Sequence, residues 1–452
     1  MGRRSDAARR PSLLCLSPSF PPRTTPTAIR AGKLLERLSS DWEVTVLAEG
    51  EAESPAAGVR VQSVRSRRPH RTLALLRRLR MGKLLEMIVW PDESIFWVIP
   101  ALLAGLRAIR RERPSAIVVF MMPYSGALAG IALRCLSGLP LIVNFDDSPT
   151  CTDMHPYFPT RLHHRLARAL EDFYIRHADA VVYVSARNLE TVRARQPAAV
   201  RERMHLVRYG ADPPAAQAAP PSPDFEIVYV GAMSGWWSLV DDEPDPGLLA
   251  RLYGAWTRLG RFELTKLDQR TSSPAIVGRA IVGADASHAE WAGRVKLTIY
   301  GNPYPPSLVE RALASAGIEN VVEVNGPIPH EQVTAIVAGA DLLFMTLPKR
   351  LDDSPGGRIS AKTYEYLATD RPILAAVPRG ENWDYLAGKD GVWLLAPDDE
   401  AGMRDAIVEL ASAKFAGSPM AFPREDLREE LSYDTRAEQF AAVIRDAIDA
   451  RR

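Results

Sequence analysis

A repeated alternation of apolar strands and amphipathic helices is the feature that most limits the folds open to this chain of 452 residues. In the N-terminal part we expect strands at 12–17, 43–48, 59–64, 116–121, 139–145, 179–184 and 204–208, separated by helices at 27–39, 101–112, 125–136, 161–177 and 186–195. Apolar, β-branched strands in βα units predict a parallel sheet covered by helices on both faces.

The proline- and alanine-rich segment 213–223, PPAAQAAPPSP, interrupts this alternation and predicts a semi-rigid linker. The pattern then restarts, with strands expected at 226–230, 295–300, 320–324, 341–346, 372–376 and 391–395 and helices at 246–258, 305–316, 330–338, 359–368, 399–412 and 434–449. Polar residues 264–290 are expected to form a loop without an assigned role.

We therefore predict an α/β protein with two doubly wound domains of similar size, in keeping with about two to three domains for this length. The expected order is a disordered tail at 1–10, a domain at 11–212, the linker at 213–223, a second domain at 224–425, and a C-terminal helical region at 426–452. This last region is expected to pack back toward the first domain.

Composition excludes several classes of protein. The formal net charge is only +1, so no nucleic-acid partner is expected. Cys15, Cys135 and Cys151 have neither CxxC nor zinc-ligand spacing, which fits a reducing cytoplasm. The N-terminus has too short an apolar run for a typical signal peptide. Residues 115–133 carry no charge and are long enough to span a bilayer, but Pro123 and Gly126 favour a strand, a turn and a buried helix.

The segment 354–376, SPGGRISAKTYEYLATDRPILAA, predicts an anion site. Its glycines precede a helix, whose N-terminal N–H groups favour phosphate, and Glu365 is placed to accept hydrogen bonds from sugar hydroxyls. The alternative is an ordinary helix-to-strand connection. Because ligands of such sheets bind outside the carboxyl ends of the strands, the cleft between two facing domains is the expected site.

Several segments, in this order along the chain, resemble the GT-B glycosyltransferases, specifically the retaining family 4 group. They are SPSFPPRTTPTAIRAGKLLERLSSDWEVTVLA (17–48), ADAVVYVSARNLETVRAR (178–195), VRYGAD (207–212), IVYVGAM (227–233), NVVEVNGPIPHEQVTAIVAGADLLFMTL (320–347) and GRISAKTYEYLATDRPILAAVP (357–378). The resemblance implies two Rossmann-like domains facing across a cleft, with the acceptor side in the first domain and the donor nucleotide in the second.

The resemblance also implies a donor site that this sequence matches only in part. Glu365 matches the family's second glutamate, which binds the ribose, but Gly357 stands where the first glutamate is expected. Backbone groups at Ser360, with Arg358 and Lys362 as cations, are then expected to meet the diphosphate. A solvated helix face is the other interpretation of Lys362.

The loop that begins at Gly231 is a further expected part of the donor site. It lacks the arginine and lysine that the family often has there, and Trp236 and Trp237 follow instead. These tryptophans are interpreted either as a cover for the base or sugar or as packing residues.

In the first domain, Arg23 is expected to meet a phosphate, in a loop without the family's paired glycines. After the strand at 139–145, Asp146 takes the place of the family's histidine facing the reacting sugar, and His155 is the nearest histidine. Both are candidate catalytic residues. A capping role for Asp146 and a structural role for His155 are the alternatives.

The resemblance implies transfer of a sugar, with retention, from a nucleotide-diphosphate sugar to a hydroxyl, without a metal or other cofactor. Arg65, Arg67, Arg68, Arg71, Arg77, Arg78 and Arg80 lie beside a leucine stripe, and a basic amphipathic helix of this kind favours anionic membrane. It indicates a lipid-linked saccharide acceptor in cell-surface polysaccharide or glycolipid synthesis, at the inner face of the plasma membrane. A solvated helix is the alternative for these arginines.

Other function classes stay open at this point. They are another GT-B activity, either a nucleotide-sugar epimerase or an inverting transferase, and a non-catalytic partner subunit. The glycine at 357 and the missing Arg/Lys pair motivate the last of these.

Overall fold

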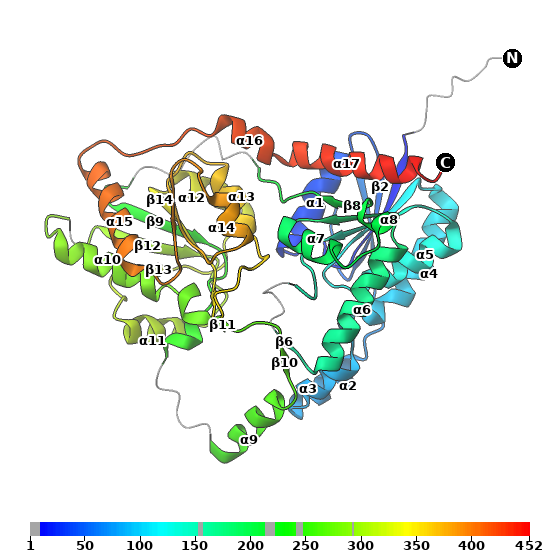
Figure 1. Cartoon of the computed structure of the whole chain (residues 1–452), viewed down its shortest axis with the longest axis horizontal. Helices are drawn as coiled ribbons and strands as arrows, with labels where there is room; N and C mark the ends of the chain where they lie inside the picture. The colour runs from blue at the N-terminus through cyan, green and yellow to red at the C-terminus, as the bar shows by residue number, and fades with distance from the viewer. Residues whose placement is uncertain (1–9, 152–156, 213–221, 241–246, 292) are drawn as a thin grey trace. The chain divides into compact units, whose positions relative to one another are not determined.

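The computed structural model describes residues 10–151, 157–212, 222–240, 247–291 and 293–452, and it divides into two compact units (Figure 1). The N-terminal unit comprises Met1–Gly210, Thr257–Leu264 and Tyr433–Arg452, and the C-terminal unit comprises Ala211–Trp256 and Thr265–Ser432. Each unit is an α/β domain around its own parallel sheet, so the predicted fold class is confirmed.

The N-terminal unit has a seven-stranded sheet in the order β3-β2-β1-β4-β5-β7-β8, in which all neighbouring strands are parallel. Its strands are β1 (Ser12–Ser17), β2 (Glu43–Glu49), β3 (Val59–Val64), β4 (Ala116–Phe120), β5 (Leu141–Phe145), β7 (Ala180–Tyr183) and β8 (Met204–Leu206). Every residue of β1, β4, β5 and β7 is buried, because helices cover both faces of the sheet.

The helices of this unit are α1 (Pro26–Leu38), α2 (His70–Arg78), α3 (Gly82–Ile88), η1 (Glu93–Trp97), α4 (Val98–Glu112), α5 (Gly126–Ser137), α6 (Arg161–His177), α7 (Ala186–Arg193), α8 (Ala198–Arg201) and α17 (Tyr433–Asp449). Thr25 caps α1, its side chain accepting from the Ala28 N–H. The short strand β6 (Tyr157–Phe158) pairs with β10 (Phe262–Glu263).

The C-terminal unit has a six-stranded parallel sheet in the order β13-β12-β9-β14-β16-β17. Its strands are β9 (Phe225–Val230), β12 (Val295–Tyr300), β13 (Val322–Val324), β14 (Leu342–Thr346), β16 (Ile373–Ala376) and β17 (Val392–Leu395), with the small pair β11 (Leu267–Asp268) and β15 (Lys349–Arg350) beside it. Its helices are η2 (Trp236–Leu239), η3 (Gln269–Ser272), α10 (Ala275–Ser287), α11 (Pro306–Ala316), α12 (His330–Gly339), α13 (Ala361–Leu367), α14 (Glu381–Leu386), α15 (Glu400–Phe415) and α16 (Glu425–Leu431), while α9 (Gly247–Arg258) has residues in both units.

Both sheets reverse their strand order at one point, between β1 and β4 in the first unit and between β9 and β14 in the second. The crevice outside the carboxyl ends of the strands at such a reversal is where ligands bind in doubly wound folds. Ligands are therefore expected at the loops after β1 and β4 in the first unit and after β9 and β14 in the second, with the loop after β5 next to that of β4.

The prediction of a polar loop at 264–290 was wrong. Residues 275–287 form α10, and Ile276, Val277, Ala280 and Ile281 are buried in the core of the C-terminal unit. The helix was missed because polar residues precede Ala275 and because many of the apolar residues of α10 are small, which weakens the helical pattern.

The prediction of one continuous basic amphipathic helix in the arginine-rich segment was also wrong. The chain forms two helices, α2 and α3, separated at Arg80, which has a left-handed φ of 56°. Leu73 points into the unit and is 4% exposed, while Leu79 is 57% exposed. The leucines are therefore divided between the core and the surface.

Residues 115–133 form β4, a turn and most of α5, as predicted. Within the described residues, no single helix has the length and apolar composition needed to cross a membrane. The segments Gly82–Ile88 and Glu93–Glu112 meet these criteria only as a pair bent by 51°.

The C-terminal helix α17 belongs to the N-terminal unit, where it packs on α1. Phe440 and Ile444 are fully buried, and the Phe440 ring stacks on Phe120 of β4 with 5.9 Å between centroids. The last helix thus completes the core of the first sheet (Figure 1).

Candidate active site

In the C-terminal unit, Gly231 follows β9 directly, at the reversal of strand order. It has φ 114°, which favours glycine, and its N–H donates to the Tyr300 carbonyl at 2.7 Å. A Cβ added here would lie 3.0 Å from the Lys362 Nζ. The structure therefore brings together Gly231 and Lys362, two of the predicted donor-binding residues.

Lys362 lies in the first turn of α13, and its Nζ is 4.8 Å from the centre of the Tyr229 ring. Arg358 is half-buried in the loop before this helix. Neither side chain makes a hydrogen bond or an ion pair that involves only described residues. Two cations without a described counter-charge beside a strand-end glycine are well suited to bind an anion.

The helix α13 is fastened to β9, because the Tyr366 hydroxyl accepts a hydrogen bond from the Val230 N–H at 3.1 Å. Burial raises the pKa of Tyr366, so this hydroxyl stays neutral. Glu365 is half-buried and follows Lys362 by three residues, a spacing that puts both on one side of the helix.

The loop before α13 is hydrogen-bonded to the start of α14. The Glu381 N–H donates to Gly356 O at 2.9 Å, and the Ser360 N–H donates to Asn382 Oδ1 at 2.9 Å. The Ser360 N–H that the sequence assigned to a phosphate is therefore already used. Gly357 is buried in this loop, and α13 is only seven residues long, so the side-chain cations are the stronger part of the site.

The tryptophans after Gly231 have separate environments. Trp236 is fully buried in the core, which supports packing, whereas Trp237 is 57% exposed. Asn302 was missed as an individual residue. It follows β12, is 6% exposed, and its Oδ1 has no partner among the described residues.

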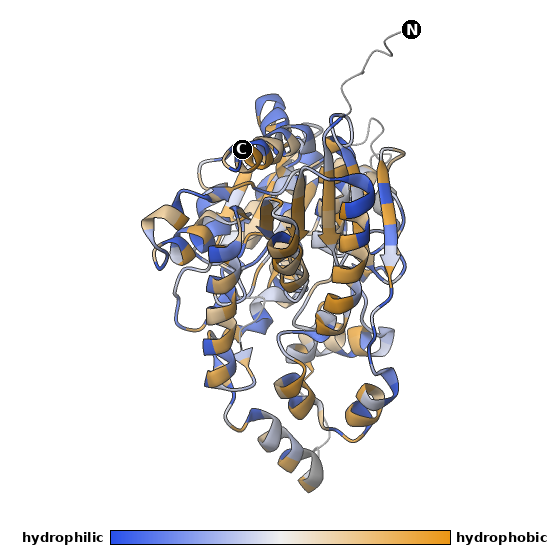
Figure 2. Cartoon of the chain, turned by 90° about the vertical axis from the view of Figure 1, so that its right-hand side faces the viewer, coloured by the Kyte–Doolittle hydropathy of each residue, from blue (hydrophilic) through white to orange (hydrophobic). Residues whose placement is uncertain are grey.

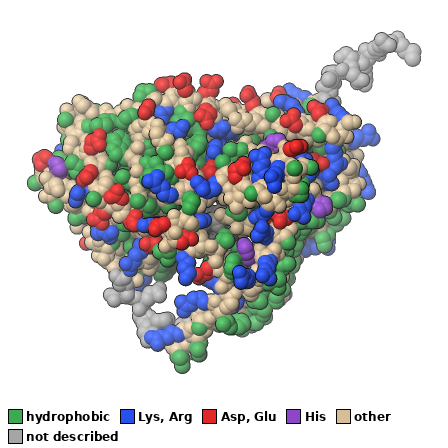
Figure 3. Space-filling model, in the orientation of Figure 1, with side chains coloured by type: hydrophobic (Ala, Val, Ile, Leu, Met, Phe, Trp, Pro, Cys, Tyr) green, Lys and Arg blue, Asp and Glu red, His purple; other side chains and the backbone are tan. Residues whose placement is uncertain are grey.

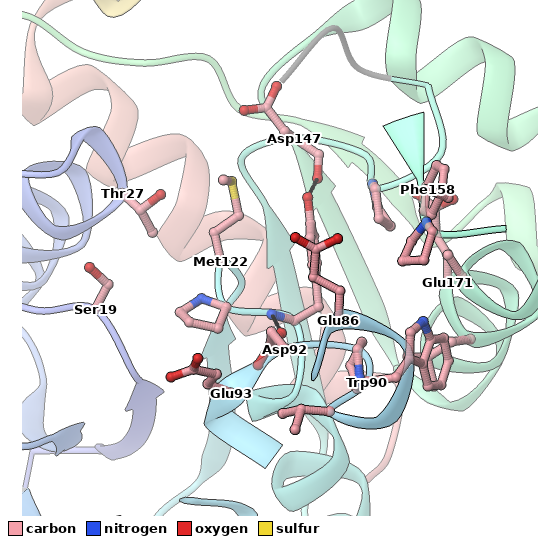
Figure 4. A pocket seen from close by; sticks show the side chains of 18 of the residues that line it. Ser19, Thr27, Glu86, Trp90, Asp92, Glu93, Met122, Asp147, Phe158 and Glu171 are labelled. Atoms are coloured by element: carbon pink, nitrogen blue, oxygen red, sulfur yellow. Dashed lines mark hydrogen bonds between the residues drawn. The ribbon is translucent and has the colours of Figure 1, made fainter. Parts of the chain in front are cut away.

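The N-terminal unit contains a pocket of about 940 Å³ at the carboxyl ends of β1 and β5 (Figure 4). Ser19 and Thr27 lie on one side in this view, and Trp90 and Phe158 lie on the other. Helices α3 and α6 contribute further residues to the lining, among them Leu85 and Leu170. Its mostly apolar lining with a few polar groups is typical of a small-molecule site.

Arg23 lines this pocket, but its guanidinium already has partners. Its Nη1 donates to Pro18 O at 3.0 Å and its Nη2 donates to Glu49 O at 2.9 Å. These bonds attach the loop after β1 to the end of β2.

Asp146 does not belong to the pocket lining. Its side chain is 1% exposed, and its Oδ1 accepts from Arg30 Nη1 at 3.2 Å and from Asn144 Nδ2 at 2.9 Å. Asn144 lies near the end of β5 and Asp146 follows the strand directly, and the hydrogen bond between them holds both side chains together at its carboxyl end. Asp147 lines the pocket instead, and His155 lies outside the described residues.

Glu171 of α6 is a pocket residue that the sequence reasoning missed. It is fully buried, and Ser148, Thr150 and Tyr183 donate hydroxyl hydrogen bonds to it at 2.7, 2.6 and 3.1 Å. Arg195 forms an ion pair with it. This network holds the loop that carries Asp147, and its members come from four separate parts of the chain.

Asp92 was also missed. Its Oδ2 accepts from the N–H groups of Tyr124 and Ser125 at 2.7 and 3.1 Å, and its Oδ1 accepts from the Ser94 N–H at 3.0 Å. Burial raises the pKa of Asp92 in spite of these bonds. The carboxylate therefore fixes the wall of the pocket between η1 and α5.

Among the residues that the structure describes, no three His, Cys, Asp or Glu side chains lie close enough together to hold a metal ion.

Comparison with known proteins bears on both units. Residues 27–210 match the model of the family described as glycosyl transferase 4-like domain. No curated protein matches the sequence.

Several solved structures share the fold of the chain. Sucrose-phosphate synthase from Thermosynechococcus elongatus is similar at 14% identity with a TM-score of 0.62, over 98% of this chain and 100% of that one. The Anabaena protein HepE in complex with UDP-glucose is similar at 12% identity with a TM-score of 0.60, over 96% and 99%. Trehalose 6-phosphate synthase from Burkholderia multivorans is similar at 13% identity with a TM-score of 0.58, over 98% and 100%. These likenesses show the GT-B fold.

Proposed function

We propose that this chain, which has the GT-B fold and whose residues 27–210 match a glycosyl transferase 4-like domain, moves a sugar from a nucleotide-diphosphate sugar to a hydroxyl of a lipid-linked saccharide, with retention. Binding of the donor nucleotide is supported chiefly by one observation: Lys362 lies next to Gly231, where the strand order of the second sheet reverses. UDP-glucose in the similar HepE structure supports a donor of this chemical class.

The proposed chemistry needs stabilisation of a leaving group above all. Negative charge grows on the diphosphate as the glycosidic bond to it breaks, and fixed cations that face this charge lower the barrier. Lys362 and Arg358 are the proposed cations, with Glu365 as the acceptor of hydrogen bonds from the ribose hydroxyls. No metal or further cofactor is part of this proposal.

The proposed acceptor site is the pocket of the N-terminal unit, with Asp147 on its wall and Asp146 holding the loop from inside. Transfer requires the acceptor hydroxyl to be held in line with the sugar carbon. The network around Glu171 supports this role, because a buried carboxylate with four donors fixes the loop on which Asp147 stands.

A lipid-linked acceptor is supported by an exposed surface that we call the apolar–basic face. It consists of apolar side chains that are 41–68% exposed, with exposed arginines between them: Leu75, Leu79, Ile88, Leu162, Leu166, Leu259, Arg71, Arg78, Arg161 and Arg165. His163 to the Met87 carbonyl and Lys83 to the Leu259 carbonyl link its elements. Figure 3 shows hydrophobic side chains beside Lys and Arg side chains along the lower right edge of the molecule, and the ribbon in Figure 2 is coloured both hydrophobic and hydrophilic along the lower helices.

This surface has the composition of one that rests on anionic lipid, since apolar side chains enter the interface and cations meet the headgroups. Helices α3 and α6 carry both the apolar–basic face and part of the pocket lining. A lipid-linked acceptor held at the membrane would therefore lie near the pocket. We accordingly propose peripheral binding at the cytoplasmic side of the membrane.

A donor screen tests the enzymatic half. Purified protein is incubated with UDP, GDP, ADP and dTDP sugars, and the released nucleotide diphosphate is measured with and without alkyl glycosides as acceptors. Calorimetry then compares donor binding to the wild type, to Glu365→Ala and to Glu310→Ala, an exposed control on α11. We expect Glu365→Ala alone to weaken binding by about tenfold, which is roughly one charge-assisted hydrogen bond. Absence of binding by any donor at millimolar concentration would refute the proposal.

The stereochemistry of the product tests retention. Proton NMR of the new anomeric centre should show the same configuration as in the donor. The opposite configuration would indicate an inverting transferase, and free epimerised sugar without acceptor would indicate an epimerase.

Vesicle flotation tests the membrane proposal. We expect binding to vesicles with about 30% phosphatidylserine, and loss of about fivefold in affinity for each of Arg78→Gln and Arg165→Gln, on the basis of about 1 kcal/mol per cation near an anionic surface. Ile88→Ser should also weaken binding. The control is Leu136→Ser, which changes an equally exposed leucine on α5 outside the apolar–basic face. Equal binding by all variants would contradict the proposal.

A further inference from the structure

The charges around the pocket of the N-terminal unit are unbalanced. Its lining includes five carboxylates but only two guanidinium groups: Glu86, Asp92, Glu93, Asp147 and Glu171, with Arg23 and Arg77. Figure 4 shows all five carboxylates around the pocket. Arg195 offsets the charge of Glu171, and Arg77 and Arg68 offset that of Glu93. Interactions between charges are strong in a partly dehydrated pocket, so the other lining carboxylates disfavour an anionic group in any bound molecule.

Neither lining arginine offsets this imbalance. Both Nη atoms of Arg23 donate to backbone carbonyls, those of Pro18 and Glu49. Arg77 is paired with Glu93, which also accepts from Arg68. A phosphate placed here would have to compete for guanidinium groups that already have partners.

The start of α1, which reaches the pocket, provides few donors for an anion. Pro26 has no N–H, and the Ala28 N–H donates to Thr25 Oγ1 at 3.3 Å. The Ile29 N–H is bonded to the Thr25 carbonyl at 3.0 Å. The helix start therefore does not form the phosphate cradle that several free N–H groups would make.

The rest of the lining is suited to an uncharged sugar with an apolar neighbour. Trp90, Tyr157 and Phe158 provide aromatic surface, and half-buried Asp147 and exposed Glu86 are carboxylates that can accept hydrogen bonds from hydroxyls. Aromatic walls with a few polar groups are common in pockets that bind amphipathic ligands.

Tyr174 is a second, independent indication of a ligand. It lines the pocket, is 1% exposed, and its hydroxyl makes no hydrogen bond to any described residue. Burial raises the pKa of Tyr174, so the group remains a neutral donor. Buried hydroxyls normally have partners, and a sugar hydroxyl in the pocket would provide one.

We infer that the acceptor presents to this pocket an uncharged sugar joined to an apolar group, and that sugar phosphates are excluded. Only the identification of this ligand as the acceptor rests on the proposed function. The selectivity of the pocket can be measured by binding alone. It separates this chain from enzymes of the same fold whose names specify phosphorylated sugars, such as sucrose-phosphate synthase.

The test compares octyl β-D-glucoside, octyl β-D-galactoside, glucose and glucose 6-phosphate by saturation-transfer NMR and calorimetry, with the alkyl glycosides below their micelle concentration. We expect at least one alkyl glycoside to bind at least tenfold more tightly than glucose, and glucose 6-phosphate to bind more weakly than glucose. Tighter binding of glucose 6-phosphate than of both alkyl glycosides would overturn the inference, and so would binding of none of the four compounds.

Variants locate the binding in this pocket. Tyr174→Phe removes the hydroxyl and should weaken alkyl glycoside binding by about fivefold without lowering the melting temperature, because that hydroxyl makes no hydrogen bond to a described residue in the free protein. Glu86→Lys should strengthen glucose 6-phosphate binding by about fivefold. Glu202→Lys, at an exposed position outside the lining, is the matched control and should change neither affinity. Equal effects of the two lysine variants would contradict the inference.

The two proposals fail in different ways. Loss of the proposed function would appear as failure of nucleotide sugars to bind the protein, whatever the pocket binds. Failure of the further inference would appear as preference for the phosphorylated sugar in a protein that still binds its donor.

Discussion

Replacing Glu171 by alanine tests how firmly the loop after β5 is held. The substitution removes the acceptor of three hydroxyl hydrogen bonds, from Ser148, Thr150 and Tyr183, and one partner of the Arg195 ion pair. Glu171 is fully buried, and the Arg195 side chain is 14% exposed. The groups left behind therefore have little access to water.

The expected loss follows from these contacts. Breaking a buried ion pair by removing one partner costs about 3–5 kcal/mol. Here Arg195 keeps Asp172, whose Oδ1 lies 2.9 Å from its Nε, and it still donates to Thr150 at 3.2 Å. Because Arg195 keeps these partners, we expect a loss at the lower end of this range. The unfolding free energy of the N-terminal unit should fall by about 3 kcal/mol.

Glutamine at position 171 should cost less, about 2 kcal/mol, because it keeps one acceptor oxygen but points an amide donor at a donor on the other side. Chemical denaturation, monitored by circular dichroism, measures the difference in unfolding free energy between each variant and the wild type. Hydrogen exchange should also show faster exchange in the loop at 146–151.

The control is Glu190→Ala, which removes a surface ion pair with Arg193 in which the glutamate is 67% exposed. Exposed pairs of this kind contribute about 0.5 kcal/mol or less. A loss below about 1 kcal/mol for Glu171→Ala, or a loss equal to that of the control, would refute the reasoning.

Three further predictions concern other residues. Lys362→Met should weaken nucleotide-sugar binding by about tenfold in calorimetry, roughly the value of one charge-assisted contact; unchanged affinity would remove Lys362 from the site. Gly231→Val should lower the melting temperature and abolish donor binding, because valine is strained at φ 114° and its side chain would meet Lys362; a variant that binds the donor normally would contradict this. Burial raises the pKa of Asp179, but hydrogen bonds from Arg134 and the Leu141 N–H outweigh it and hold that pKa below its usual range. The stabilisation is then present at neutral pH and lost as the pH falls from about 4 through the folded pKa, so Asp179→Asn should lose stability at pH 7 and show a weaker decrease on acidification than the wild type.

Most of the fold could be predicted from the sequence, because the strands of both sheets are apolar runs that stand apart from the amphipathic helices between them. Helix α10 could not, since its polar approach and its small residues hide the helical periodicity. The α2–α3 break could not either, because it depends on the left-handed backbone of Arg80, which no residue in the region indicates.

The candidate site could be predicted only where its residues are close in sequence or share a strand end. Gly231 and the residues near Lys362 follow from the loops at the reversal of strand order. The burial of Asp146 could not be predicted, because Asp146 lies in the loop directly after β5 and its partner Arg30 comes from the distant helix α1. The Glu171 network could not be predicted either, since its residues come from α6, from β7, from the loop at 146–151 and from the chain after α7, and only packing brings them together.

The position of α17 has a consequence for how the protein is made. Phe440 and Ile444 complete the core of the N-terminal unit, yet they are synthesised after the whole C-terminal unit. One apolar face of the first sheet therefore stays partly uncovered while the whole C-terminal unit is synthesised. Partly folded chains with exposed apolar surface tend to aggregate. Expression of residues 1–210 alone should for this reason give insoluble protein, and adding 433–452 as a separate peptide should improve its solubility.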